Sequence, residues 1–130
     1  MNQKEPQKMR RADNRTKGTV VCERLEIATS MAEQSRGLLG RDSLAPGNGM
    51  LFEGRGVLPL MWMHMFFMRF AIDIVFLGRG NKVISISRRL RPWRVSTMVF
   101  GARRALELEA GAAEKSSTQV GDRITFETIG

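Results

Sequence analysis

Alternating hydrophobic and polar positions predict that this chain is built mainly from short β-strands. In the run TVVCERLEIA at residues 19–28, the side chains of Val21, Leu25 and Ile27 share one face, and this two-residue period is typical of a half-buried strand. Three shorter apolar runs, each with turn residues beside it, predict further strands. These runs are residues 50–52, 105–110 and 123–129.

A β-hairpin is the element that the pattern indicates most directly. The runs AIDIVFL at 71–77 and KVISIS at 82–87 are separated by GRGN at 78–81, and a glycine-bearing connection of this length typically joins two antiparallel strands. The segment RRLRPWR at 88–94 contains a proline and several arginines, so we expect a loop there.

One short helix is predicted at residues 30–39, directly after the first strand. Ser30 and Glu33 have the S-x-x-E spacing of a capping box, and Gly40 is placed to end the helix. A single helical turn is also expected at residues 112–116. The predicted fold class is therefore α+β, a β-dominated compact antiparallel sheet or small barrel with a short helix after the first strand.

The first seventeen residues differ from the rest of the chain. Residues 1–17 carry six basic and two acidic side chains without apolar periodicity, a pattern typical of a disordered basic tail. This tail supplies half of the net charge of +8. We expect residues 18–130 to form a single domain, because a segment of this length has room for one hydrophobic core.

Cysteine content and hydropathy indicate a cytoplasmic protein. The single cysteine, Cys22, has no partner for a disulfide within the chain, and no apolar run follows the first basic residues as it does in a signal peptide. The long apolar stretch at residues 57–77 contains His64, Arg69 and Asp73. Because such side chains are costly in the hydrocarbon core of a bilayer, we interpret the stretch as core strands and not as a membrane span.

Several segments, taken in order and with their spacing, resemble a known protein family. They read RGLLGRDSL at 36–44, GMLFE at 49–53, FFMRFAIDIVFL at 66–77, ALELEAG at 105–111 and VGDRI at 120–124. Together they resemble the domain of unknown function 192 family (DUF192) over about residues 19–128. The resemblance implies a compact antiparallel β domain with a short helix after its first strand. Because the family has no agreed activity, it implies no catalytic residue and no cofactor.

The sequence departs from the family pattern in one region. Many members have an Asn-Thr pair followed by a Pro-Leu-Asp-Ile run, whereas this chain lacks the pair and has alanine in place of the proline. A branch with His-Thr-Phe and Met-Arg-Phe-Pro-Ile-Asp is more similar, with His64, Met68, Arg69 and Asp73 at matching positions and Met65 in place of the threonine. A role of the polar pair is therefore not carried over to this chain.

The segment MWMHM at residues 61–65, followed by Met68, is the most unusual local feature. Thioethers and an imidazole are ligands that copper(I) prefers, and the candidates are Met61, Met63, His64, Met65 and Met68. In a strand, however, the methionines at 61, 63 and 65 lie on the face opposite to Trp62, His64 and Phe66. We therefore favour methionines and aromatic residues that fill a core between sheet and helix, and we expect no cofactor.

An enzyme is an alternative with little support from the residues. His64 and Asp73 are a candidate acid–base pair, and Cys22 is a candidate nucleophile beside His64. No glycine-flanked serine of the hydrolase type accompanies the single histidine, and a cysteine within a strand is usually a small buried hydrophobe. For Asp73 we favour a structural role, either paired with Arg69 or accepting backbone N–H bonds.

A cluster of arginines around one tryptophan indicates a basic surface. Arginine and an aromatic ring together suit a polyanion such as nucleic acid, with weak and salt-sensitive binding. No recognition helix, zinc finger or RNA-stacking motif accompanies the charge. The candidate residues, which act together with the basic tail, are Arg88, Arg89, Arg91, Trp93, Arg94, Arg103 and Arg104.

The leading hypothesis is a non-catalytic module that binds a small ligand or has a structural role. Its pocket is expected near Trp62, His64, Met68, Arg69 and Asp73. The alternatives are an enzyme that uses His64 and Asp73, a polyanion binder and a copper(I) binder. An enzyme requires His64 or Asp73 exposed in a concave pocket, whereas a polyanion binder requires an exposed stripe of arginines with a tryptophan.

Overall fold

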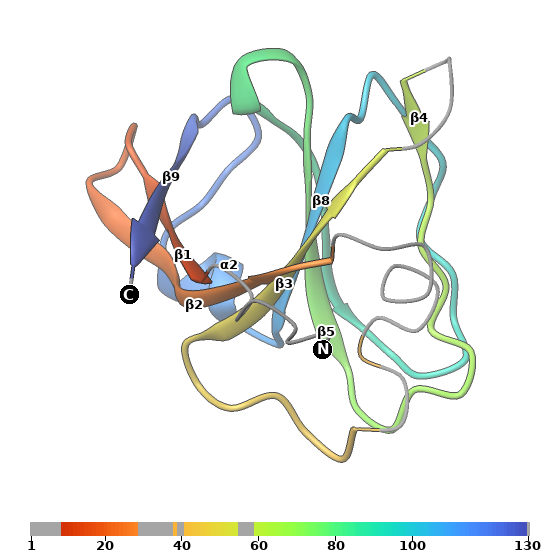
Figure 1. Ribbon diagram of the computed structural model, residues 1–130. Helices are drawn as coiled ribbons and strands as arrows, with labels where there is room; N and C mark the ends of the chain where they lie inside the picture. Colours follow the sequence, from red (N-terminus) through yellow and green to blue (C-terminus); the bar gives the residue numbers. More distant parts are fainter. Residues whose placement is uncertain (1–8, 29–37, 39–40, 55–58, 130) are drawn as a thin grey trace, which may run out of the picture.

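The computed structural model describes residues 9–28, 38, 41–54 and 59–129. These residues form nine strands, one 3₁₀ turn and one short α-helix (Figure 1). In chain order the elements are β1 (Met9–Asn14), β2 (Thr19–Ile27), β3 (Asn48–Glu53), β4 (Leu60–Met61), β5 (Ile72–Leu77), η1 (Arg79–Asn81), β6 (Val83–Leu90), β7 (Val99–Phe100), β8 (Arg104–Glu109), α2 (Ala112–Lys115) and β9 (Ile124–Ile129).

Seven of these strands form one mixed sheet in the order β6-β5-β8-β3-β2-β1-β9. Neighbouring strands are antiparallel except β2 and β3, which are parallel along residues 24–27 and 48–51. The prediction of an antiparallel sheet is therefore wrong for this pair. Parallel strands need a crossover connection longer than a hairpin turn, and residues 28–47 supply it. The other two strands, β4 and β7, form a separate antiparallel pair.

The predicted hairpin is confirmed by the pairing of β5 with β6, in which Phe76 lies opposite Ser85. Strand β6 continues to Leu90, so the prediction of a loop that begins at Arg88 is wrong. The backbone of Arg89 has a φ of +49°, and the register against β5 shifts at this point. A bulge therefore accommodates the two arginines without ending the strand.

The prediction that residues 1–17 form a disordered tail is wrong for β1. This strand pairs with β2 on one side and with β9 on the other. Ala12 and Asn14 are buried, and the Asn14 amide donates a hydrogen bond to the Asp122 carboxylate at 2.9 Å. Because a polar residue and its partner in a distant segment hold the strand, apolar periodicity does not reveal it.

The predicted helix at residues 30–39 falls almost wholly outside the described residues. The expected helical turn near residue 112 is confirmed as α2. No helix in the described part of the chain is long and apolar enough to cross a membrane.

The central strands separate two hydrophobic cores. Strand β5 alternates between them, with Ile74 and Phe76 in one and Val75 and Leu77 in the other. The first core, which we call the β4-side core, includes Met61 and is covered by β4 and β7; the second, the α2-side core, includes the alanines of α2. Figure 1 shows α2 and β4 on opposite sides of the β3–β8–β5 strands. Burial on both faces explains why β5 is apolar almost throughout.

The two outer strands of the sheet meet at one end. The N–H of Val83 at the start of β6 donates to the C=O of Asp122 at 2.8 Å, and the N–H of Gly121 donates to the C=O of Val83 at 2.8 Å. An antiparallel bridge also joins Lys82 to Arg123 just before β9. These contacts curl the sheet around the α2-side core.

Candidate functional site

Two segments that are far apart in the sequence pair to form a ribbon over the β4-side core. Leu60 lies opposite Phe100 in the β4–β7 pair, and a bridge between His64 and Val95 continues the pairing. The N–H of Met65 donates to the C=O of Arg94 at 2.7 Å, which holds the two segments in register. We call residues 59–68 and 91–100 the aromatic ribbon.

The inner face of the aromatic ribbon is made of methionines. Met61, Met65 and Met68 are buried in the β4-side core, and the side chain of Met65 is 0% exposed. Met63 is partly buried against the same core. The alternation expected for a strand is confirmed, but the prediction that the aromatic residues also fill the core is wrong, because Trp62, His64 and Phe66 face outward. The thioethers therefore pack as core side chains, on the side of the backbone opposite to His64.

The outer face of the aromatic ribbon is a chain of exposed rings. His64 stacks on Phe66 with ring centroids 5.0 Å apart, and the Trp62 ring lies 6.2 Å from His64. Phe66 and Phe67 both contact Trp93, at 6.4 and 4.7 Å. Trp93 is 58% exposed and Phe67 is 69% exposed. A surface of this kind on a small protein indicates a binding site.

Two bulky residues of the aromatic ribbon have an uncommon backbone conformation. The φ angles of Phe67 and Trp93 are +63° and +69°, in the left-handed region that large side chains rarely adopt. Both residues sit in tight turns, in which the N–H of Met68 reaches the C=O of Met65 and the N–H of Arg94 reaches the C=O of Arg91. These turns place the Phe67 and Trp93 rings side by side in solvent.

The predicted arginine cluster is divided by the structure. Arg91 and Arg94 flank Trp93, are exposed, and form no ion pair with another described residue. Three of the other arginines have partners elsewhere. Arg88 donates to the C=O of Thr118, Arg89 lies 3.7 Å from the Glu114 carboxylate, and Arg104 pairs with Glu53 at 3.1 Å. Trp93 is thus accompanied chiefly by Arg91 and Arg94.

His64 and Asp73 do not form a pair. Asp73 is buried, and its two carboxylate oxygens accept the backbone N–H groups of Arg89 at 2.8 Å and of Ala113 at 2.9 Å. The Nδ1 atom of exposed His64 accepts a contact of 3.3 Å from the N–H of Phe66. Of the two structural roles expected for Asp73, acceptance of backbone N–H bonds is confirmed. The ion pair with Arg69 is wrong, since Arg69 pairs with Asp42 at 2.6 Å.

The residues expected to line one ligand pocket face different ways. Trp62 and His64 are neighbours on the aromatic ribbon, whereas Met68 is in the β4-side core. Asp73 belongs to the other face of β5, where it holds the start of α2. Among the described residues there is also no group of three His, Cys, Asp or Glu side chains placed to hold a metal ion.

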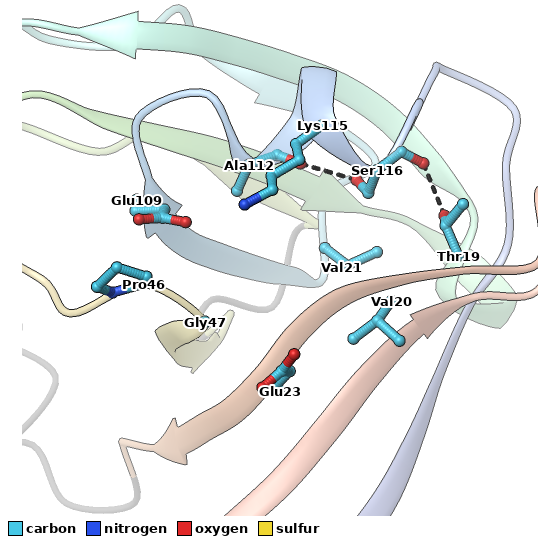
Figure 2. A pocket seen from close by; sticks show the side chains of 10 residues that line it. All are labelled: Thr19, Val20, Val21, Glu23, Pro46, Gly47, Glu109, Ala112, Lys115 and Ser116. Carbon is cyan, nitrogen blue, oxygen red and sulfur yellow. Dashed lines mark hydrogen bonds between the residues drawn. The ribbon is translucent and has the colours of Figure 1, made fainter.

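A cavity of about 470 Å³ lies on the other side of the sheet, between β2 and α2. Figure 2 shows that β2, the turn at residues 46–47, the end of β8 and α2 surround it. Thr19 Oγ1 donates to the C=O of Ser116 at 2.6 Å and so ties β2 to the end of α2. Sequence reasoning missed this cavity, because its walls come from four separate segments and share no motif.

Three charged side chains border the cavity. Glu23 on β2 and Glu109 at the end of β8 supply carboxylates, and Lys115 on α2 supplies an ammonium group. None of them forms an ion pair with another described residue. In Figure 2 the Lys115 amine extends over the space that Glu23 and Glu109 border. Unpaired charges of both signs around one concavity are suited to a polar ligand.

Cys22 lies beside this cavity but is not poised for nucleophilic chemistry. Burial raises the pKa of its thiol to about 11, and the nearby carboxylates of Glu109 and Glu23 act in the same direction. The thiol donates to the C=O of Gly47 at 3.2 Å. Because the thiolate is the reactive form, Cys22 is a structural thiol at neutral pH.

Besides Asp73, which lies on the α2 side, a buried carboxyl group is found on the side of the β4-side core. Glu107 on β8 is opposite Met50 of β3 and Ile74 of β5. Burial raises its pKa to about 7, although the positive charge of Arg41 acts in the opposite direction. No hydrogen bond to its side chain is found within the described residues. No sequence pattern distinguished this glutamate from the exposed ones around it.

Comparison with known proteins places this architecture in one family. The family model DUF192, described as an uncharacterised conserved region, matches residues 12–126. A UPF0127 protein of Thermococcus sibiricus is 31% identical over 114 residues, which are 88% of this chain and 73% of that protein. A UPF0127 protein of Pyrococcus furiosus is 32% identical over 118 residues, covering 87% of this chain and 95% of that protein.

A solved structure supports the same conclusion. The crystal structure of a protein of unknown function from Novosphingobium aromaticivorans superposes with a TM-score of 0.75 and 26% identity, over 90% of this chain and 83% of that one. These relatives are uncharacterised, so they assign no specific function. The residues matched by the family model, 12–126, include most of the central sheet and the whole of the aromatic ribbon. The chain belongs to the DUF192 family.

Proposed function

We propose that this protein is a non-catalytic binding module whose aromatic ribbon binds single-stranded nucleic acid. The observation that carries the proposal is the row of exposed rings from Trp62 to Trp93, flanked by Arg91 and Arg94. Bases of single strands stack on aromatic side chains whatever their sequence, while arginines contact the phosphates. A duplex offers no such free bases, because its bases are already stacked on one another.

The charge of this part of the chain favours a polyanion over a neutral partner. Between Asp73 and Glu107 the sequence contains eight lysines and arginines and no acidic residue. Arg91 and Arg94 are exposed and form no ion pair with another described residue, so no carboxylate of the described chain competes with a phosphate for them. A nucleic-acid ligand also agrees with the cytoplasmic location expected from the sequence.

The rigidity of the aromatic ribbon supports binding without a folding step. Ser96 donates its N–H to the C=O of Met63 at 2.8 Å and accepts the N–H of Met63 through Oγ at 2.8 Å. Below, the methionines anchor the ribbon to the β4-side core. Rings that are already held in place lose little entropy on binding.

Fluorescence anisotropy with a labelled single-stranded oligonucleotide of mixed sequence tests the proposal. We expect Trp93→Ala to weaken binding at least about tenfold, because stacking on one base contributes about 1–3 kcal/mol. Trp93→Phe keeps a ring and should retain most of the affinity. For the double variant Arg91→Gln, Arg94→Gln we expect the slope of log K against log salt to fall by about 0.7 for each phosphate that the arginines neutralise in the natural protein.

Matched controls separate stacking from general attraction to a cationic protein. Arg15→Gln removes an exposed arginine in the turn between β1 and β2 and should leave affinity nearly unchanged. A duplex of the same sequence should bind more weakly than the single strand. Binding that is insensitive to Trp93→Ala, or preference for vesicles with anionic lipids over the oligonucleotide, would contradict the proposal.

A further inference from the structure

We infer that the cavity between β2 and α2 binds a small zwitterion, a molecule with one ammonium and one carboxylate group such as a free α-amino acid. This site is separate from the aromatic ribbon. Val21 and Ala112, which line the cavity, belong to the α2-side core, whereas the methionines of the ribbon belong to the β4-side core. The central sheet lies between the two sites (Figure 1).

The size and the walls of the cavity suit a small ligand. Its volume of about 470 Å³ is within the usual range of about 300–1,000 Å³ for small-molecule sites. The walls are held by hydrogen bonds, since Ser116 Oγ donates to the C=O of Ala112 at 2.9 Å and the N–H of Arg24 donates to the C=O of Gly47 at 2.9 Å. The site therefore exists before a ligand arrives.

Gly47 keeps the cavity open on the side of Glu23. Its φ of +83° favours glycine, and a Cβ atom at this position would lie 3.6 Å from both the Cβ and Oε2 atoms of Glu23. A side chain extending beyond that Cβ would compete with a ligand for the Glu23 carboxylate. The turn thus leaves this carboxylate accessible from the cavity.

The charges identify the chemical class of the ligand. Glu23 and Glu109 both line the cavity, so an ammonium group bound inside it would have a carboxylate to pair with. Lys115 pairs with neither carboxylate within the described residues. A simple cation would leave Lys115 unpaired and repelled, whereas the carboxylate of a zwitterion would pair with it. The apolar surface of Val21 and Ala112 would accommodate an aliphatic side chain.

Isothermal titration calorimetry with three matched probes tests this inference on the full chain. The probes are leucine, which carries both charges, leucinamide, which keeps only the ammonium, and N-acetylleucine, which keeps only the carboxylate. We expect leucine to bind at least about tenfold more tightly than either of the other two, since each loses one ion pair inside a concave site. Amide chemical-shift changes should be confined to residues around β2, Gly47 and α2.

Variants at the charged positions should each remove one of the two preferences expected for leucine. Lys115→Gln should remove the preference for leucine over leucinamide, and Glu109→Gln should remove most of the preference for leucine over N-acetylleucine. The matched control is Glu114→Gln, which neutralises a neighbouring carboxylate that faces Arg89 and should leave all three affinities unchanged. All these side chains are partly or fully exposed, and circular dichroism checks that each variant folds.

Each outcome decides the question. No heat of binding and no shift changes with leucine at about 10 mM, a concentration at which even weak sites are partly filled, would overturn the inference. Equal binding of leucine and leucinamide would also overturn it, because the site would then recognise a cation alone. Failure of leucine to bind leaves the proposal for the aromatic ribbon intact, since the two sites share no residue.

Discussion

The two faces of the central sheet carry surfaces of different character. On the β4 side the aromatic ribbon presents exposed rings and unpaired arginines above a layer of methionines. On the α2 side a cavity is bordered by two carboxylates and one ammonium group. The same strands, β5 and β8, contribute alternate residues to both sides. Because successive side chains of a strand point to opposite faces, one sheet separates two different chemical environments.

The difference extends to the two buried acids of the central strands. Asp73 points to the α2 side, where two backbone N–H groups satisfy its carboxylate. Glu107 points to the β4 side among methionine and isoleucine neighbours, and its pKa is raised to about 7 by burial. One acid is a fixed structural acceptor, and the other is a group that exchanges its proton near neutral pH.

The largest loss of stability is expected when Asp73, on the α2 side of the sheet, is replaced. Asp73→Ala leaves the N–H groups of Arg89 and Ala113 without their acceptor. Because a hydrogen bond to a charged group contributes about 1.5–3 kcal/mol, we expect the free energy of unfolding to fall by about 4 kcal/mol in urea titrations. Asp42→Ala removes an exposed ion pair with Arg69 and should change stability by less than about 1 kcal/mol. Similar changes in stability for the two variants would show that Asp73 is not a structural acceptor.

A somewhat smaller loss of stability is expected from a substitution on the inner face of the aromatic ribbon, and a much smaller one from a substitution on its outer face. Met65→Ala opens a cavity in the β4-side core, where this side chain is 0% exposed, so we expect the free energy of unfolding to fall by about 3 kcal/mol. Trp93→Ala removes an exposed ring and should destabilise the protein by less than about 1 kcal/mol while weakening nucleic-acid binding. Chemical denaturation of both variants measures the contrast. A large decrease in stability from Trp93→Ala would mean that the outer rings are structural.

The smallest effect concerns the proton on Glu107. Because burial raises its pKa from 4.5 to about 7, the folded protein binds a proton that the unfolded chain releases, and stability falls as pH rises between these two values. From pH 5.5 to pH 8 this group alone should lower the free energy of unfolding by about 2 kcal/mol.

Glu107→Gln isolates this contribution, because glutamine has the same shape and no charge. The difference in unfolding free energy between the variant and the natural protein should grow as pH rises and level off above about pH 8. A difference that does not vary with pH would show that Glu107 is ionised throughout, with Arg41 as its compensating charge.

Most strands were predictable from the sequence because their burial follows a simple period. The β5–β6 hairpin, β8 and β9 each have apolar residues at alternate positions or a buried run beside a turn. Strand β1 was not predictable in this way, because its buried Asn14 depends on Asp122 at the far end of the chain. The parallel pairing of β2 with β3 also escapes local patterns, which carry no information on strand direction.

The candidate sites were predictable only in part. Alternation predicted that Trp62, His64 and Phe66 lie on the face opposite to the methionines, but it did not predict that this face is exposed. Trp93 with its flanking arginines was identified from composition. The contact between Phe67 and Trp93 depends on the pairing of two segments that are distant in the sequence, so no local pattern predicts it. The cavity needed four such segments, and no local rule brings Glu23, Glu109 and Lys115 together.

The contacts that join the start of β6 to the start of β9 also bear on aggregation. An open sheet has two edges with unpaired backbone groups that can add a strand from another molecule. Here the hydrogen bond between Val83 and Asp122 joins the two edges of the sheet at one end, so these backbone groups are already paired. The bulge at Arg89 twists β6, so this edge is not a flat template for another strand. The rest of these edges carries charges such as Arg88 and Glu127. These features leave less of either edge open to strand addition by another molecule.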